Sequence, residues 1–524
     1  MKILICDPLG AEGVQLLKKQ PGYDVDELPG LARKDLLAKI GRYDALIVRS
    51  ATRADREVIE AGTSLRVIAR AGVGTDNIDV EAASQRGIVV TNTPDANTLA
   101  AAEHTLALLL AVCRHIPEAD ATVKSGAWGR GRFMGRQLYG KTLGIVGLGR
   151  IGVQVAQRAE AFGMKILVHD PYVAESRARE LELQLVSLPE LLKQSDVVTL
   201  HTPSTDATRG LVSKQHLALM KKSALLINCA RGDLVDEQAL AEALTKKQIA
   251  GAALDVFRNE PPAGSPLLGA PNLVLTPHLA ASTTEAQAEV SLQIARQVIG
   301  VLSGERYENV LNMPFTGPFA EVKPYLRLAS RVGSLSAQVL EGRIKHIEWE
   351  FAGGPAEYSD AVKTALLRGI LQPVLGHEVN YVNAQRLAAL RGLELSRVEH
   401  LAEATHDTIA CRLVVGRKSR LVVGALVARE WPRIVQIDGY RLDADPTGDL
   451  LFTVSKDVPG VIGKVGTLLG KAGVNIAEWR LGRDAALRQA VTLVNLDSAI
   501  PQKTLLALRK LPAVLEAKAV RLGE

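Results

Sequence analysis

The sequence has few cysteines and few aromatic residues, and it contains no long hydrophobic run and no block of like charge. Its four cysteines, at positions 6, 113, 229 and 411, form no CxxC pair, so neither a metal site nor a disulfide framework is predicted. Reduced thiols are typical of a cytoplasmic protein. Aromatic residues make up only 4% of the chain, which is little for a surface that stacks on nucleic-acid bases.

The longest apolar run, residues 106–112, is well short of the ~20 residues that span a bilayer. The apolar stretch at residues 3–5 is too short for a signal peptide and indicates a first strand. The net charge is +6, but Lys and Arg are scattered and nowhere form a run of five. We therefore expect neither a membrane nor a nucleic-acid partner.

A chain of 524 residues is longer than one hydrophobic core usually supports, so several domains are expected. Up to about residue 95, apolar runs alternate with amphipathic stretches, at 3–5, 45–48, 67–69 and 88–90. After a predicted helix near 97–115 a second series follows, at 143–146, 166–168, 197–200, 225–227, 250–254 and 273–275. Both series predict doubly wound α/β domains with parallel sheets.

Beyond residue 283 the pattern of alternating strands and helices ends. A helix is predicted over 283–303, and residues 309–314 have the composition of a boundary. Residues 315–445 mix helical and strand patterns without a catalytic motif, which indicates a separate α+β domain. The last segment, residues 449–524, predicts the order βαββαβ of a ferredoxin-like domain.

The clearest motif is the sequence GLGRIG at residues 147–152, which follows an apolar strand and opens a helix. Asp170 lies at the end of the next strand, close to the ~20-residue distance of a dinucleotide-binding site. The glycines permit a tight turn and a close approach to pyrophosphate, and Asp170 would bind the ribose hydroxyls. A carboxylate there repels a 2′-phosphate, so NAD is favoured over NADP. The alternative is a glycine-rich packing turn without a ligand.

Three polar segments follow later strands of this series, at residues 228–232, 255–262 and 276–280. Hydride transfer from a carbon that bears a hydroxyl group needs a base, for which His278 is the candidate. Glu260 would hold its imidazole and raise its pKa, and Arg231 would bind a substrate carboxylate. Taken singly, His278 fits a capping or core histidine equally well, and the other two fit surface charges.

These segments resemble the signatures of the D-2-hydroxyacid dehydrogenase family, and the resemblance covers nearly the whole chain. It implies an oxidoreductase in which Arg231 binds substrate, Glu260 pairs with the base and His278 transfers the proton. It implies that NAD is contacted by Val73, Gly147, Gly149, Arg150, Ile151, Gly152, Asp170, Thr202, Cys229, Ala230, Asp255, His278 and Ala280.

The same resemblance assigns substrate binding to Arg49, Arg70, Gly72 and Arg130. Arg130 belongs to a cluster with Arg132 and Arg136, which fits a small phosphorylated or carboxylated ligand about as well as a solvated loop. By resemblance Arg130 reaches across a dimer interface, which implies a homo-oligomer, either a dimer or a tetramer. The implied reaction is oxidation of 3-phosphoglycerate with NAD, the first step of serine biosynthesis.

The segment 449–524 resembles an ACT domain, a small-molecule sensor, in which Asp457 and Asn475 would bind L-serine as an effector. The implied domains are 1–95 with 284–312 for substrate, 96–283 for NAD, 313–446 as an intervening domain similar to allosteric substrate-binding domains, and 449–524 for regulation. Two alternatives stay open: another D-2-hydroxyacid dehydrogenase, such as a glyoxylate or hydroxypyruvate reductase, and a non-catalytic scaffold that senses NAD. The length beyond residue 315 opposes the first, and the presence of Arg231, Glu260 and His278 opposes the second.

Overall fold

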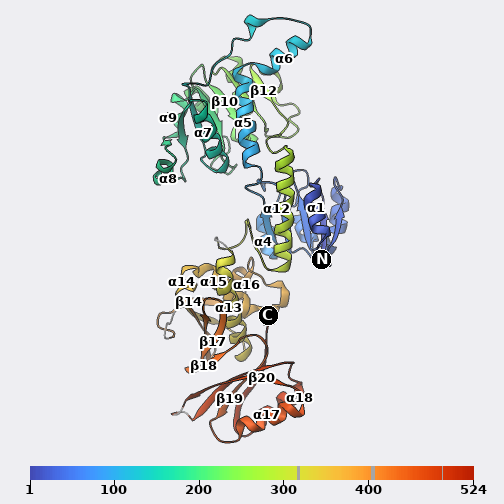
Figure 1. The fold of residues 1–524 in the computed structure, drawn as a ribbon, viewed down its shortest axis with the longest axis vertical. Coiled ribbons are helices and arrows are strands. Elements are labelled where there is room, and N and C mark those ends of the chain that lie inside the picture. Colours follow the sequence, from blue (N-terminus) through green and yellow to red (C-terminus); the bar gives the residue numbers. More distant parts are fainter. Residues whose placement is uncertain (316–318, 403–406, 485, 487, 524) are drawn as a thin grey trace.

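The computed structural model describes residues 1–315, 319–402, 407–484, 486 and 488–523. Four units are stacked along the long axis of the molecule (Figure 1), and the N-terminal unit is the second in this stack. The mixture of parallel α/β sheets and two further sheets confirms the predicted fold class.

The N-terminal unit is a five-stranded parallel sheet in the order β2-β1-β3-β4-β5. Its strands are β1 (Lys2–Ile5), β2 (Asp24–Glu27), β3 (Ala45–Val48), β4 (Val67–Arg70) and β5 (Val89–Asn92). The inner strands β1, β3 and β4 are almost wholly buried, as expected when helices cover both faces of a parallel sheet. The sequence prediction missed strand β2, because its residues DVDE are mostly charged and lie at the sheet edge.

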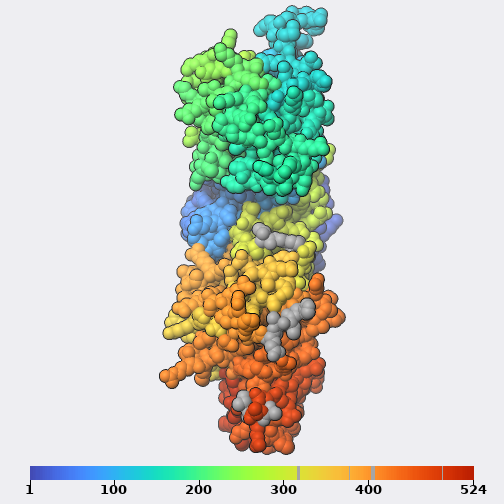
Figure 2. Space-filling model, turned by 90° about the vertical axis from the view of Figure 1, so that its left-hand side faces the viewer, coloured from blue at the N-terminus to red at the C-terminus, as the bar shows by residue number. Residues whose placement is uncertain are grey.

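Helices far apart in the sequence cover this sheet. One face packs against α2 (Arg33–Lys39), α3 (Arg56–Ala61) and α4 (Val80–Arg86). The other face packs against α1 (Ala11–Lys18) and α12 (Thr284–Ser303). Figure 2 shows the blue N-terminal segment and the yellow-green segment in one tier beneath the green unit. The polypeptide therefore leaves this unit after β5 and returns to it through α12.

The second unit has a seven-stranded parallel sheet in the order β12-β11-β10-β9-β6-β7-β8. Its strands are β6 (Thr142–Val146), β7 (Lys165–His169), β8 (Gln184–Leu185), β9 (Val197–Leu200), β10 (Leu225–Asn228), β11 (Gly251–Leu254) and β12 (Leu273–Leu275). Six of these strands were predicted, and the short edge strand β8 was not. The strand order changes direction between β6 and β9, which is the switch point where doubly wound sheets bind ligands.

Apolar helix faces cover both sides of this second sheet. One side carries α5 (Thr98–Cys113) and α7 (Arg150–Ala161), and the other carries α9 (Leu188–Gln194), α10 (Lys214–Leu219) and α11 (Glu237–Thr245). The remaining helices of this unit are α6 (Ile116–Lys124) and α8 (Glu175–Glu180). Among the described residues no single helix is long and apolar enough to span a membrane; only α5 and α6 together, bent by 63°, have the length and composition.

The third unit packs helices against a six-stranded mixed sheet in the order β14-β13-β15-β16-β17-β18. The helices are α13 (Phe319–Val339), α14 (Gly354–Glu357), α15 (Ser359–Leu375) and α16 (Ala384–Leu390). The strands are β13 (His346–Ala352), β14 (Glu394–Arg397), β15 (Thr408–Val415), β16 (Lys418–Val427), β17 (Trp431–Ile437) and β18 (Tyr440–Ala444).

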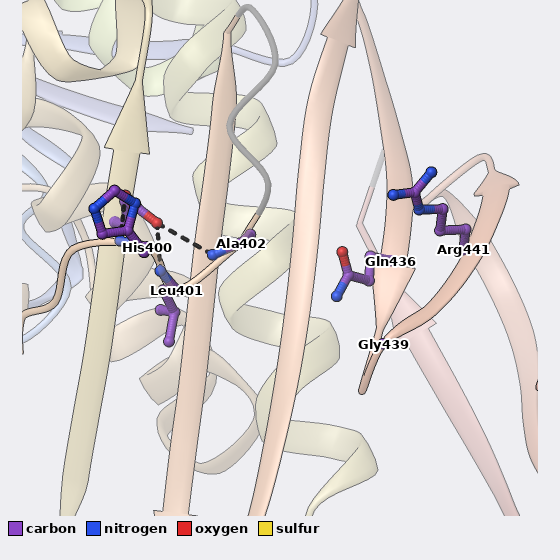
Figure 3. Close-up of a pocket in the computed structure, with 7 residues that line it drawn as sticks. His400, Leu401, Ala402, Gln436, Gly439 and Arg441 are labelled. Atoms are coloured by element: carbon purple, nitrogen blue, oxygen red, sulfur yellow. Dashed lines mark hydrogen bonds between the residues drawn. The ribbon is translucent and has the colours of Figure 1, made fainter. Parts of the chain in front are cut away.

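A hollow of 450 Å³ lies on the surface of the third unit (Figure 3). The Glu350 carboxylate at its wall accepts hydrogen bonds from the backbone N–H groups of His400, Leu401 and Ala402, at 3.0, 2.7 and 3.2 Å. These bonds tie the loop after β14 to strand β13. We therefore interpret Glu350 as a structural carboxylate.

The C-terminal unit has the predicted element order. Its elements are β19 (Gly448–Lys456), α17 (Val461–Lys471), β20 (Ile476–Asp484), β21 (Gln489–Leu496), α18 (Gln502–Arg509) and β22 (Val514–Leu522). The antiparallel order β20-β21-β19-β22 is that of a ferredoxin-like sheet. Leu450, Phe452 and Val520 belong to the same hydrophobic core as α13 and α15, so the last two units are packed firmly together.

Candidate active site

The glycine turn after strand β6 has the backbone geometry that the sequence predicts. Gly147 has a φ of +97°, and a Cβ atom there would lie 2.7 Å from the carbonyl oxygen of His201. A Cβ atom on Gly152 would lie 2.2 Å from the carbonyl oxygen of Gly147, so helix α7 packs tightly on the turn. A Cβ atom on Gly149 would meet nothing within 4 Å. The turn is therefore closed toward the protein and open at the end of the helix, where a pyrophosphate would bind.

Asp170 follows strand β7 and faces the same turn. Its carboxylate accepts the Leu148 N–H at 2.8 Å with one oxygen and the Tyr172 N–H at 2.9 Å with the other. A carboxylate has about four acceptor positions, so two remain for ribose hydroxyls. The two backbone bonds fix the orientation of the carboxylate before a ligand arrives.

The other predicted cofactor contacts lie along this edge of the sheet, with Thr202 after β9, Cys229 and Ala230 after β10, and Asp255 and Ala280 after β11 and β12. Ile151 lies in the first turn of α7, and Arg150 forms an ion pair with Asp95. Burial raises the pKa of the Cys229 thiol to about 12, so this cysteine stays protonated. Its side chain therefore fills space beside the cofactor site, its backbone is available for contact, and its thiol does not act as a nucleophile.

His278 and Glu260 form a hydrogen-bonded pair. The distance from His278 Nδ1 to Glu260 Oε2 is 2.7 Å, and Glu260 Oε1 accepts the Phe257 N–H at 3.1 Å. Burial raises the pKa of Glu260, but the hydrogen bond and charge of His278 together with the Phe257 N–H outweigh burial, so the pKa of this carboxyl lies below its ordinary value. With Nδ1 facing an ionised carboxylate, Nε2 is the nitrogen left to accept a substrate proton.

The loop that carries His278 is held by the buried carboxylate of Asp255. Asp255 accepts hydrogen bonds from the Leu279 and Ala280 N–H groups at 2.7 and 2.8 Å and from the Thr276 hydroxyl at 2.6 Å. His104 of helix α5 lies 3.2 Å from the same carboxylate. Burial raises the pKa of Asp255, but these hydrogen bonds lower it further than burial raises it. The side chain thus anchors the catalytic loop, a role that the sequence did not indicate.

Three predicted arginines converge near this pair. Arg231 donates from Nε to Asp76 at 3.1 Å and from Nη1 to the Ala230 carbonyl at 2.7 Å. Arg70 is half-buried, and its buried Nε atom has no hydrogen-bond partner within the described residues. Burial and the neighbouring Arg231 lower its pKa to about 10. Burial likewise lowers the pKa of Arg49.

A single cleft of 1090 Å³ brings the catalytic pair and these arginines together. It lies between the first two units, and its walls include Arg49, Arg70, Gly72, Val73, Arg231, Glu260 and His278. Of these three guanidinium groups only Arg231 has a carboxylate in an ion pair among the described residues, so the cations beside a histidine base fit a small acid with more than one negative charge.

Other predicted residues lie elsewhere. Arg130 is exposed, in a short 3₁₀ turn (Arg130–Arg132), and does not line the cleft of its own chain. Asp457 forms an ion pair with Arg483 at 2.6 Å, and Asn475 donates to Asp497 at 2.7 Å, both within the C-terminal unit. Within the described residues no three His, Cys, Asp or Glu side chains are grouped so that they could hold a metal.

Several residues of the cleft were not predicted from the sequence, namely Arg53, Asp76, Asn77, Asn97 and Arg209. Arg53 follows the same strand as Arg49, so its position after a strand end was an available signal. Asn77 donates to the carbonyl oxygens of Arg49 and Thr52, both at 2.6 Å, and so shapes the cleft wall. No motif indicates this contact, because it joins two loops of the folded sheet.

Two family models match the chain. Residues 106–280 match the "D-isomer specific 2-hydroxyacid dehydrogenase, NAD binding domain", and residues 321–438 match the "D-3-phosphoglycerate dehydrogenase intervening domain". A curated D-3-phosphoglycerate dehydrogenase from Methanocaldococcus jannaschii is 42% identical, with 100% of both chains covered. One from Bacillus subtilis is 39% identical, with 99% of both chains covered.

Solved structures match the first two units. The TT0316 protein from Thermus thermophilus is 40% identical with a TM-score of 0.56, and the match covers 59% of this chain and 100% of that one. An NAD-dependent formate dehydrogenase from Staphylococcus aureus, solved with NAD, is 30% identical with a TM-score of 0.55 and covers 59% of this chain and 99% of that one.

Proposed function

Because the chain belongs to the D-3-phosphoglycerate dehydrogenases, within the D-isomer-specific 2-hydroxyacid dehydrogenase family, we propose that it oxidises 3-phospho-D-glycerate to 3-phosphohydroxypyruvate with NAD. The observation that carries the proposal is the His278–Glu260 pair in a cleft lined by arginines. This reaction would be the first step of L-serine biosynthesis, and we expect the enzyme to act in the cytoplasm.

In this reaction His278 is the base. Glu260 holds Nδ1, so Nε2 faces the cleft and takes the proton of the substrate hydroxyl as the carbon loses its hydride. Glu260 then stabilises the imidazolium that forms. When bound, NAD accepts the hydride, and the open turn at Gly149 with the fixed carboxylate of Asp170 fits its pyrophosphate and ribose.

The arginines bind the two charged ends of the substrate. Arg231 lines the same cleft as His278 and would hold the carboxylate bidentately, while Arg49 and Arg70 would bind the phosphate. Burial and the neighbouring cations lower the pKa of Arg70, so an anion in the cleft would relieve the repulsion among these guanidinium groups.

A steady-state assay tests the proposal. NAD reduction is measured with 3-phosphoglycerate and, as controls, with lactate and glycerate. We expect a much larger kcat/KM for 3-phosphoglycerate. Preference for an unphosphorylated acid would favour the activity of another 2-hydroxyacid dehydrogenase. NAD binding without turnover of any acid would favour a non-catalytic scaffold that senses NAD.

We also propose the domain division 1–95 with 284–312, 96–283, 313–446 and 449–524. The return of helix α12 to the first sheet supports the discontinuous first domain. A homo-oligomer would bring the exposed Arg130 to a neighbouring cleft. Analytical ultracentrifugation, with activity of mixed Arg130→Ala and wild-type subunits, tests this arrangement.

The cofactor preference depends on Asp170. We expect Asp170→Ala to raise the KM for NAD and to narrow the advantage of NAD over NADP, because both a ribose contact and a negative charge are lost. Steady-state titrations of both cofactors measure the two effects. A wild-type preference for NADP would contradict our interpretation of this strand end.

The C-terminal unit is proposed as the site of serine control. We expect L-serine to bind the full-length protein and inhibit it, and Asp457→Ala with Asn475→Ala to abolish binding while uninhibited turnover stays the same. A remote effector acts only through different affinities for two conformations. Calorimetry and initial rates separate the outcomes: binding without inhibition removes the regulatory role, and no heat at millimolar serine removes the site as well.

A further inference from the structure

His104 is a partly buried histidine to which the proposed reaction assigns no part. It lies on α5, the helix through which the chain enters the second unit after strand β5. Its neighbours one turn away on the same face, Ala101 and Leu108, are buried, and only 19% of the His104 side chain is exposed. An imidazole in such a place needs hydrogen-bond partners, because a buried polar group without one is costly.

The partners of His104 hold the loop that carries His278. His104 Nε2 lies 3.2 Å from Thr276 Oγ1 and 3.2 Å from Asp255 Oδ1. The Thr276 hydroxyl donates its own proton to Asp255 Oδ1 at 2.6 Å, so its oxygen can only accept from the imidazole. An ionised carboxylate also only accepts. Nε2 of His104 therefore carries a proton and is the donor in this contact.

The Asp255 carboxylate is fully buried and is surrounded by four donors. Besides His104 and Thr276 these are the Leu279 and Ala280 N–H groups, at 2.7 and 2.8 Å. A carboxylate has about four acceptor positions, so the set of donors is complete. Burial raises the pKa of Asp255, and the hydrogen bond from His104 comes first among the contacts that lower it below its ordinary value. His104 is therefore a principal partner of this carboxylate.

The backbone of His278 has a conformation that needs such support. Its φ is +58°, in the left-handed region that few residues other than glycine adopt. The His278 N–H donates to the Asp255 carbonyl oxygen at 2.9 Å, and the next two N–H groups donate to the Asp255 carboxylate. A strained conformation persists only where the surrounding contacts fix it. Asp255 thus fixes the backbone from which the His278 imidazole reaches Glu260.

We propose that His104 is a positioning residue for the reaction and acts on His278 through Asp255. As a donor it completes the contacts around the Asp255 carboxylate, and it ties the loop of residues 276–280 to helix α5. The inference rests on the proposed function, in which His278 is the base. Without the His104 donor a buried acceptor position is left unfilled, which is costly and favours a rearrangement of the loop.

The variants His104→Leu and His104→Gln test the role of the N–H donor. Leucine has no donor, whereas glutamine can place an amide N–H near the position of Nε2. With the acid that the wild type oxidises fastest, we expect His104→Leu to lower kcat by about tenfold or more, because a misplacement of about 1 Å can cost about 10²-fold. The KM for the acid should change little, since Arg49, Arg70 and Arg231 follow other strands. His104→Gln should restore most of the wild-type kcat.

Hydrogen–deuterium exchange of the full-length protein without substrate is a second readout, which does not depend on activity. Asp255 accepts the N–H groups of Leu279 and Ala280, so a loosened loop should exchange these amides faster. We expect the peptide of residues 276–282 to exchange faster in His104→Leu and at the wild-type rate in His104→Gln.

Thr105→Val is the matched control for helix α5. Thr105 is buried next to His104 and donates to the Ala101 carbonyl of its own helix at 2.8 Å, so the exchange of residues 276–282 should stay as in the wild type. His104→Asn, whose amide reaches only the position of Nδ1, repeats the comparison with a polar side chain should the leucine variant not fold.

Three results would overturn the proposal. The first is wild-type kcat with wild-type loop exchange in His104→Leu, and the second is a loss of kcat without faster exchange of the loop. The third is an equal effect of His104→Leu and His104→Gln, which would exclude the N–H donor as the cause. If the wild type oxidised no acid, the proposed function would fail, whereas the loop exchange of the variants would still decide the role of His104.

Discussion

Replacing His278 with alanine is expected to lower kcat by about 10²-fold or more, because a general base typically contributes 10²–10⁴-fold. Glu260 orients the imidazole through Nδ1, and no carboxylate contacts Nε2 among the described residues. NAD affinity should change little, since the glycine turn and Asp170 lie on other strands. Rapid-mixing and steady-state rates of NAD reduction measure the effect.

His216→Ala serves as the control for this experiment. His216 of helix α10 is hydrogen-bonded to Ser213, the residue before the helix, and does not line the active-site cleft. Its loss should therefore leave kcat near that of the wild type. Turnover of His278→Ala at the wild-type rate would exclude His278 as the base. Equal losses in the two variants would indicate a general loss of structure.

Glu260→Gln should have the second largest effect. A glutamine can present its amide N–H to Nδ1 of His278, which places the proton on Nε2 and blocks the base. In a serine protease the corresponding Asp-to-Asn change lowers kcat by about 10⁴-fold, so we expect a loss of about 10²-fold or more here. Glu260→Asp, which keeps the charge, should retain more activity.

The pH dependence of the activity that Glu260→Gln retains is an independent test of the pairing between Glu260 and His278. The pKa of Glu260 lies below its ordinary value, so this carboxylate is ionised at neutral pH. Without this anion the imidazolium loses its proton more easily, and the acidic limb of the kcat/KM profile should move to lower pH. A limb at the wild-type pH would mean that the two residues do not act as a pair.

The periodic segments of the chain were predictable because their residues interact locally or with one layer. The apolar runs of β3 and β10 are buried along their whole length, as parallel strands require. The charged strand β2 and the two-residue strand β8 were not predictable, because pairing at a sheet edge depends on the neighbouring strand rather than on their own composition.

The sequence by itself determined that the glycine turn, Arg231, Glu260 and His278 each follow a strand of one predicted parallel series. Parallel strands bring their carboxyl ends to one edge of the sheet. Only the tertiary structure decided which side chains meet there. The contact of His104 with Asp255 and the hydrogen bond from Asn77 to the Arg49 carbonyl join segments distant in sequence or separate loops. Such contacts depend on how helices cross and how units pack, and the spacing of residues along the sequence does not determine that geometry.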